Sequence, residues 1–274
     1  MRYGFAAVAL TLLAQPAFAM SGEPGAGETG WAGVYGGVEV GAARSRPRII
    51  FTQSTVQGIG ANPTLTITSS GEVPNSRDTG ALYGGRIGWQ GQSGHLVYGL
   101  EADAHAGGIS NDSLLTFPAG SHAASPSGTE TQSRRLKETF GGSMRLRAGF
   151  AFGGTLIYAA GGVTEARVRL RSLNSYSYTT AANPGTTNTV ANSGSETRSF
   201  TGWTAGGGIE QHLSGRISIG IDARYDHFGS VGYGSAGQTT TRTDNVNTAF
   251  AASPIGGTVR LTDERASVRL TWHF

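Results

Sequence analysis

The sequence predicts an all-β protein, an eight-stranded antiparallel transmembrane β-barrel with short turns at one end and long loops at the other. Two observations support this prediction. Runs of roughly ten residues alternate apolar and polar side chains with a period of two, while helical periodicity is nearly absent. Within these runs nearly every charged side chain lies opposite the aliphatic ones. This segregation favours a membrane barrel over a soluble sandwich, because a basic side chain that faces the middle of the lipid costs about 2–4 kcal/mol.

The predicted strands are joined alternately by a short turn and by a long polar segment. They cover residues 31–43, 81–90, 98–105, 140–150, 156–170, 203–213, 217–226 and 266–274. The segments that end near residues 78, 137, 199 and 263 are rich in Ser, Thr and Asn and are predicted as loops, although parts such as 48–55 and 65–68 could extend strands beyond the bilayer. In the glycine-rich fifth run, we expect Ala166 and Val168 to face lipid and Glu165 and Arg167 to face inward.

The first residues predict export. Arg2 precedes an apolar run that is too short to anchor the chain in a bilayer, and Ala17-Phe18-Ala19 has the small-x-small pattern of a cleavage site. The expected division is a signal peptide over residues 1–19, cleaved after Ala19, a short periplasmic linker over 20–30 and the barrel over 31–274. We expect the exported protein to reside in the bacterial outer membrane. The chain contains no cysteine, which excludes disulfides and thiolate sites.

Several strand segments carry a family resemblance. They are Trp31–Gly37, Tyr98–Asp103, Arg145–Phe150 and Gly202–Glu210. In this order and spacing they resemble the porin-like small outer-membrane β-barrel proteins of alphaproteobacteria, which share the architecture of the OmpA and OmpX barrels. The final alternation, which ends in Trp272 and Phe274, is similar to the signal that the barrel-assembly machinery recognises. The resemblance implies that this machinery and the outer-membrane lipids are partners of the chain.

Charged residues on the inward faces predict a polar network that fills the barrel lumen, because side chains can fill the interior of a barrel with about eight strands. The members are Glu39, Arg86, Glu101, Asp103, His105, Arg145, Arg147, Glu210, Asp222, Arg224 and Arg269. Glu101, Asp103 and His105 share one face at a spacing of two, which could present ligands to a metal. Arg145 and Arg147 are simpler partners for these side chains, so we expect neither a metal nor a cofactor.

Basic residues gather where the strands leave the membrane on the side of the long loops. We expect Arg44, Arg46, Arg48, Arg134, Arg135 and Lys137 to contact lipopolysaccharide, and Arg167, Arg169 and Arg171 form a third cluster. Arginine suits bidentate contact with phosphate. The alternative is an ordinary solvated rim.

The function predicted is structural: a barrel that contributes to envelope integrity and surface contacts, with no enzymatic activity. One alternative is a narrow porin for passive diffusion of small solutes. Another is binding of haem or a host surface by the loops, where His122 is the clearest histidine. Asp226-His227 and the pair Ser267 and His273 are residue types that can act as catalytic groups, but a structural role is favoured for both pairs. The oligomeric state is left open.

Overall fold

The computed structural model describes residues 30–59, 62–73, 78–107, 109–119, 127–180, 183–235, 250–251 and 255–274. All regular structure in these ranges is β-strand. The described residues include no helix with the length and apolar character needed to cross a membrane.

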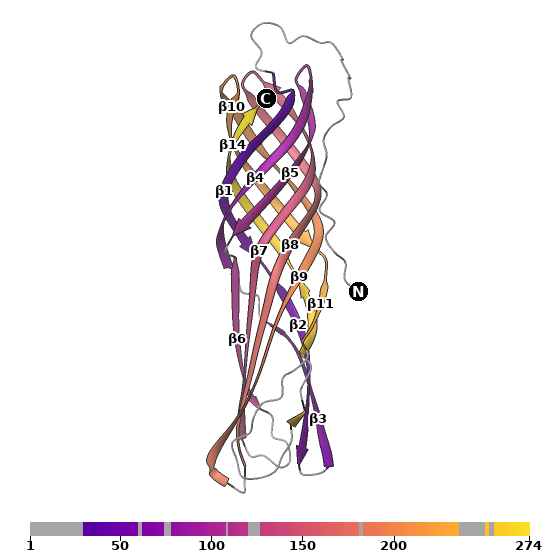
Figure 1. The fold of residues 1–274 in the computed structure, drawn as a ribbon, viewed down its shortest axis with the longest axis vertical. Coiled ribbons are helices and arrows are strands. Elements are labelled where there is room, and N and C mark those ends of the chain that lie inside the picture. The colour runs from indigo at the N-terminus through magenta and orange to yellow at the C-terminus, as the bar shows by residue number, and fades with distance from the viewer. Residues whose placement is uncertain are drawn as a thin grey trace.

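Eight strands form a closed antiparallel ring (Figure 1). They are β1 (Gly33–Ser45), β4 (Asp78–Ser93), β5 (Leu96–Gly107), β7 (Ser127–Phe152), β8 (Thr155–Thr180), β9 (Asn183–Ser214), β10 (Ile217–Phe228) and β14 (Thr262–His273). Their order around the ring is β5-β4-β1-β14-β10-β9-β8-β7, and the pairing of β7 with β5 closes it. The eight-stranded barrel that the sequence predicts is therefore confirmed.

The pairing of the first and last ring strands shows how alternation becomes a barrel wall. In the β1–β14 register, Val38 lies opposite Leu270 and Glu39 lies opposite Arg269. Val38 is 59% exposed on the outer surface, whereas Glu39 is 2% exposed inside the ring. Because neighbouring strands are paired in register, one apolar row faces outward and one polar row faces inward on each of them.

Glycine allows tight packing of the ring and tight turns at one end. A Cβ added at Gly162 would overlap the carbonyl oxygen of Met144 on the adjacent strand. Gly94 and Gly153, in the turns after β4 and β7, have a φ of +57°, a conformation that side chains disfavour. These short turns and the C-terminus lie at the same end of the molecule (Figure 1).

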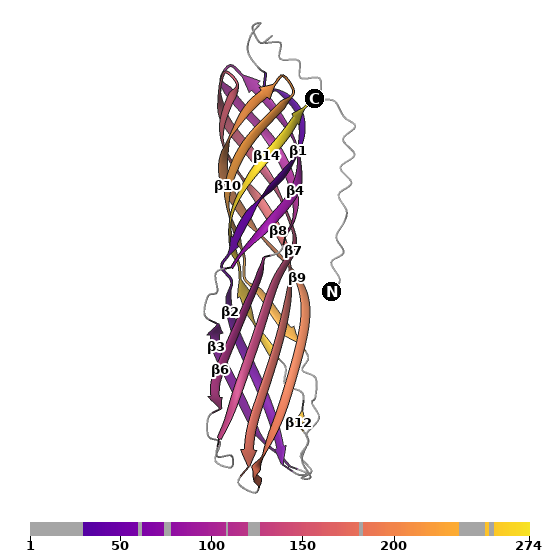
Figure 2. The same cartoon turned by 90° about the vertical axis from the view of Figure 1, so that its left-hand side faces the viewer.

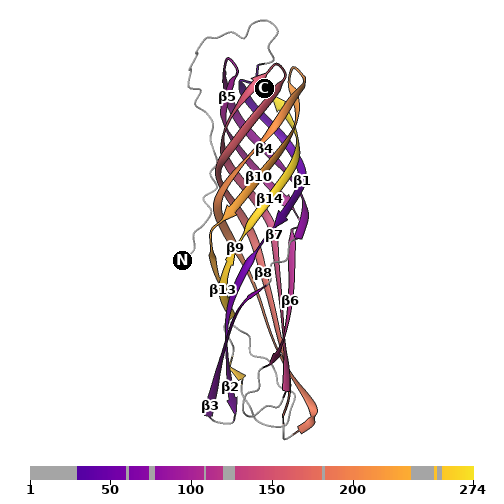
Figure 3. The ribbon, with the colours of Figure 1, turned by 180° about the vertical axis from the view of Figure 1, so that it is seen from behind.

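At the opposite end the structure extends well beyond the ring (Figures 2 and 3). The long strands β7, β8 and β9 continue into this extension, where β6 (Ser110–Ala119) pairs with β7. A second sheet contains β2 (Arg48–Ile59), β3 (Asn62–Val73), β11 (Val231–Ser235), β12 (Phe250–Ala251) and β13 (Ile255–Arg260).

Much of this extension was predicted as loop, and that prediction is wrong for its described residues. Ser172 pairs with Gly194 and Ser177 pairs with Thr189, so the β8–β9 hairpin continues through the segment predicted as the third loop. A polar strand lacks the apolar alternation on which the prediction relied, and backbone pairing does not require it. Residues 48–55 and 65–68, expected to extend strands, do lie in β2 and β3.

The phase predicted for the fifth strand is also wrong. Ala166 and Val168 of β8 point inward and are fully buried, whereas Arg167 is exposed on the outside. The lumen changes character along its axis: beyond the charged middle it is apolar, so an inward row can consist of small aliphatic side chains. They pack there with Leu136, Phe200 and other buried residues.

A closed ring predicts heat-modifiable migration. No strand of the ring has a free edge, so SDS at room temperature should leave the barrel folded and compact. We expect the purified protein to change its mobility on an SDS gel after boiling. Identical mobility before and after boiling would contradict a closed barrel.

Candidate functional site: the charged lumen

Charged side chains occupy the middle of the lumen between two apolar layers. At the short-turn end, Trp31 is completely buried and packs with Val97, Ala151 and Leu156. At the other end, beyond the charges, lies the larger apolar cluster that contains Leu136, Val168 and Phe200. The charged groups are therefore shielded from water at both ends of the barrel.

Glu101 on β5 is the centre of the charged layer. Its Oε2 accepts hydrogen bonds from Arg86 at 3.0 Å and from Tyr35 at 2.9 Å, and Arg147 approaches it at 3.5 Å. Its Oε1 bonds Arg145 and lies 3.4 Å from Arg269. Four guanidinium groups, from three different strands, thus surround one carboxylate.

Two further carboxylates share these arginines. Glu210 on β9 lies 3.0 Å from Arg86 and 3.4 Å from Arg147. Asp222 on β10 lies 2.7 Å from Arg269 and 3.3 Å from Arg145. The network therefore joins opposite walls of the barrel.

Tyr158 links β8 to the network, since β8 supplies no charged side chain to this layer. Its hydroxyl donates to Asp222 at 2.8 Å and accepts from Arg269 at 2.9 Å. The guanidinium of Arg147 lies 4.0 Å from the centre of the Tyr158 ring. With this tyrosine, every strand of the ring contributes a side chain to the network.

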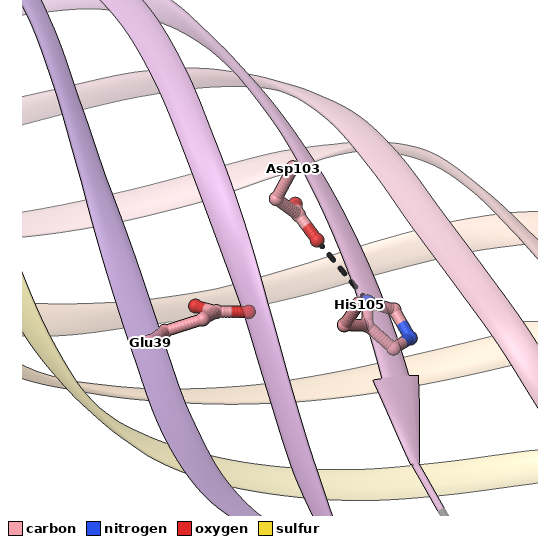
Figure 4. A group of neighbouring side chains, drawn as sticks. All are labelled: Glu39, Asp103 and His105. Carbon is pink, nitrogen blue, oxygen red and sulfur yellow. Dashed lines mark hydrogen bonds and ion pairs between the residues drawn. The ribbon is translucent and has the colours of Figure 1, made fainter.

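Glu39, Asp103 and His105 lie close enough together to be considered as a metal site (Figure 4). Arg224 occupies the same space, at 3.0 Å from Asp103, 3.3 Å from His105 Nδ1 and 4.0 Å from Glu39. Arg265 bonds the other ring nitrogen of His105. The guanidinium groups supply the positive charge that a cation would supply, so these residues do not fit a metal ion.

A second group of charges lies farther along the lumen, around Arg265. This arginine bonds Asp226 at 2.7 Å, Glu138 at 2.9 Å and Asp263 at 3.0 Å. Because it also bonds His105, the second group is continuous with the first.

All eleven residues predicted for the lumen are buried there and linked to one another. The set contains five carboxylates and five arginines, besides His105, and the second group adds three carboxylates and one arginine. Each charge of the predicted set has an oppositely charged partner, and desolvation of an unpaired ion would cost several kcal/mol. The arrangement holds the strands together, because the partners of each charge come from other strands of the ring.

Sequence reasoning missed several side chains of the lumen. Among them are Tyr35, Glu138, Tyr158, Asp263 and Arg265. Tyr35 and Arg265 stand in phase with the inward rows of Glu39 and Arg269, so the alternation contained the signal. Glu138 precedes an irregularity in the β7–β8 register that reverses the phase of the strand, and sequence alone does not reveal such a bulge.

Comparisons with known proteins place this architecture in a bacterial context. The chain is 27% identical over 182 residues to the 25 kDa outer-membrane immunogenic protein of Brucella abortus biovar 1 (strain 9-941). It is 26% identical over 184 residues to the protein of that name from Brucella canis. Each alignment covers 66% of this chain and 66% of the relative, just under two thirds of the relatives' own length. No protein-family model matches.

The chain is a small outer-membrane β-barrel protein. The resemblance to alphaproteobacterial barrels that the sequence predicts is confirmed by the Brucella relatives. The outer membrane is its location, as predicted. The short-turn end is accordingly the periplasmic end, and the extension is extracellular.

Solved outer-membrane barrels are similar at a much lower level. Pseudomonas aeruginosa OprG is 13% identical, with 89% of this chain and 97% of that chain covered and a TM-score of 0.41. Escherichia coli OmpT, a protease, is 8% identical, with 88% and 97% covered and a TM-score of 0.39.

The basic residues predicted to contact lipopolysaccharide fall into different environments. Arg46 pairs with Glu264 at 2.9 Å, and Arg44 is half-buried. Arg48, Arg135 and Lys137 are exposed. Arg134 points into the extension and is 4% exposed, so the expectation that it contacts lipid is wrong.

The two pairs of residues with catalytic side chains are engaged in other contacts. Asp226 faces inward and bonds Arg265, whereas the ring of His227 lies 5.6 Å from that of Trp203, which is exposed on the outside. Ser267 bonds Glu39, and His273 bonds Ser218 at 3.0 Å in the buried periplasmic layer. His122 and the predicted signal peptide lie outside the described residues.

The central carboxylate provides a test of the network in the outer-membrane barrel. Replacing Glu101→Gln leaves four guanidinium groups around a neutral amide, which we expect to lower the free energy of unfolding by about 3–5 kcal/mol. Urea unfolding of the refolded barrel in detergent measures this change.

The matched control is Glu264→Gln. Glu264 forms an exposed ion pair with Arg46, so its loss should change stability by no more than about 1 kcal/mol. Equal effects of the two substitutions would show that the lumen network does not stabilise the barrel.

Proposed function

We propose that this outer-membrane barrel is a sealed structural element of the envelope and does not conduct solutes. The observation that supports this proposal is the continuous network across the lumen: Arg145 and Arg269 are fully buried and bind carboxylates from opposite walls. The apolar layers around Trp31 and Phe200 lie on either side of it. Passage of an ion would require these guanidinium–carboxylate contacts to separate in a medium of low dielectric constant.

Conductance across a planar bilayer tests this proposal. We expect purified protein to produce no stable single-channel steps. The double variant Arg145→Ala/Asp222→Ala removes a bonded pair while Arg269 keeps Glu39 and Glu101 as partners, at 3.3 and 3.4 Å. It therefore shortens two lumen side chains without leaving an unpaired charge, and we expect it to conduct.

Stable steps from the unmodified protein would overturn the sealed barrel and favour the narrow porin instead. A silent double variant that remains heat-modifiable would show that the Arg145–Asp222 pair is not what closes the lumen.

We further propose that the last outward row acts as the assembly signal of the barrel. Trp272 and Phe274 follow Val268 and Leu270 on the lipid-facing side, and Phe274 is 78% exposed. The backbone N–H of Phe274 donates to the carbonyl of Val34, which places the terminal residue at the seam between the first and last strands.

Deletion of Phe274 tests the signal. We expect export to continue while the amount of folded protein in the outer membrane falls severalfold, measured by fractionation and heat-modifiable migration. The control Phe274→Tyr keeps an aromatic ring and should assemble normally. Normal outer-membrane levels of the deletion variant would contradict the proposed role.

Surface contact is assigned to the extracellular extension. Its strands β2, β3, β6 and the outer parts of β7–β9 project past the ring (Figure 1). The relatives are named as immunogenic outer-membrane proteins. We propose that the extension is the part of this barrel that other cells or molecules meet.

A further inference from the structure

The outer surface of β7 and β8, at the extracellular edge of the apolar band, carries a concentrated basic patch. Its members, called here the basic face, are Arg135, Lys137, Arg167, Arg169 and Arg171. All five are exposed. On β8 the three arginines stand at alternate positions, about 7 Å apart along one side of the strand.

The strand register places like charges directly opposite one another on this face. Lys137 pairs with Arg169, and Arg135 pairs with Arg171. Directly opposed like charges destabilise an antiparallel pair. The lumen also places like charges opposite one another, such as Arg224 and Arg265, but there each arginine binds at least one carboxylate.

Only part of this charge is neutralised by the described residues. Asp112 on β6 forms a bidentate contact with Arg135, at 2.5 and 2.7 Å, and this hydrogen bonding lowers the pKa of Asp112 below its ordinary value. No ion pair joins Lys137, Arg167, Arg169 or Arg171 to any carboxylate in the described ranges. An anion from outside the chain would remove the repulsion.

An apolar groove of about 450 Å³ adjoins the basic face. Phe140, Met144 and Val163 line its membrane side, and Glu165, Arg167, Ser199 and Thr201 line its other side. Gly142 stands between Phe140 and Met144 in the outward row of β7, and Glu165 of β8 lies opposite it. The groove is therefore amphipathic along its length.

The strand length places this groove at the outer border of the hydrocarbon. The outward row of β7 runs from Phe150, near the periplasmic turn, to Phe140, and a tilted strand crosses a bilayer in about 9–11 residues. Trp203 lies opposite Val163 and packs 5.7 Å from Tyr225, as in an aromatic girdle. Arg167, Arg169 and Lys137 lie just beyond, at the level of lipid headgroups.

We propose that the groove and the basic face together bind one molecule of lipopolysaccharide, with an acyl chain against Phe140, Met144 and Val163 and a lipid A phosphate held by Lys137, Arg167 and Arg169. A planar guanidinium presents two donors to phosphate oxygens, and a dianionic phosphate neutralises two opposed cations. The lipopolysaccharide contact predicted from three basic clusters is thereby assigned to one face of the barrel. This proposal does not depend on whether the lumen is sealed.

The test uses the full-length mature protein, refolded in detergent without lipopolysaccharide and titrated with lipid A. We expect Lys137→Gln/Arg169→Gln to weaken binding at least about tenfold, because each charged hydrogen bond contributes strongly. Lipid A without its phosphates should bind the unmodified protein just as weakly. Val163→Trp fills the groove without changing charge and should also weaken binding.

The matched control is Arg216→Gln/Arg260→Gln. Both arginines are exposed and lie outside the basic face, Arg216 at a periplasmic turn and Arg260 on β13. This variant should bind lipid A like the unmodified protein. The melting temperature of lipid-free Lys137→Gln/Arg169→Gln should be unchanged or higher, since a repulsive pair is removed, which separates lost binding from misfolding.

Three results would overturn the proposal. One is unchanged lipid A affinity in Lys137→Gln/Arg169→Gln. Another is equal competition by inorganic phosphate, which would indicate a site for a free anion. The third is equally tight binding of phosphatidylglycerol with the same dependence on Lys137 and Arg169, which would indicate general attraction of anionic lipid.

Discussion

The pairing of buried charges inside the ring is the constraint on which the rest of the structure depends. Glu101 can be buried only because four arginines reach it, and these arginines can be buried only because Glu210, Asp222 and Glu39 share them. The partners come from different strands. A shift of one residue in any strand would turn its inward row toward lipid and leave buried ions without partners, so the network selects one register for the whole barrel.

The two apolar layers of the lumen strengthen this constraint. With Trp31 and its neighbours on one side and the Phe200 cluster on the other, water has little access to the charges, and each ion pair acts in a medium of low dielectric constant. Such pairs are costly to separate. The same feature that specifies the register therefore opposes the passage of ions, which links the folding of the barrel to its proposed role as a sealed envelope protein.

The outer surface follows a different rule. Between the aromatic girdles it is apolar. On the extracellular side of this band, Lys137 of β7 lies opposite Arg169 of β8, and no carboxylate of the described residues forms an ion pair with either. Charges inside the barrel are compensated by the chain itself, whereas these charges face the layer in which the membrane supplies phosphate. The extracellular extension then continues the same strands into water, where backbone pairing persists after the apolar alternation has ended.

The sequence by itself determined the fold class, the eight ring strands, the outer-membrane location and ten inward charges, because an alternation with period two assigns each residue of a membrane strand to lipid or lumen. It did not determine that the polar segments are strands, since backbone hydrogen bonds leave no side-chain pattern. The reversed phase of Ala166 and Val168, the bulge beside Glu138, and the partner of each lumen charge were decided only by the tertiary structure. The physical reason is that these features depend on which strands become neighbours and in what register, and residues such as Arg86 and Glu210 are brought together only when the ring closes.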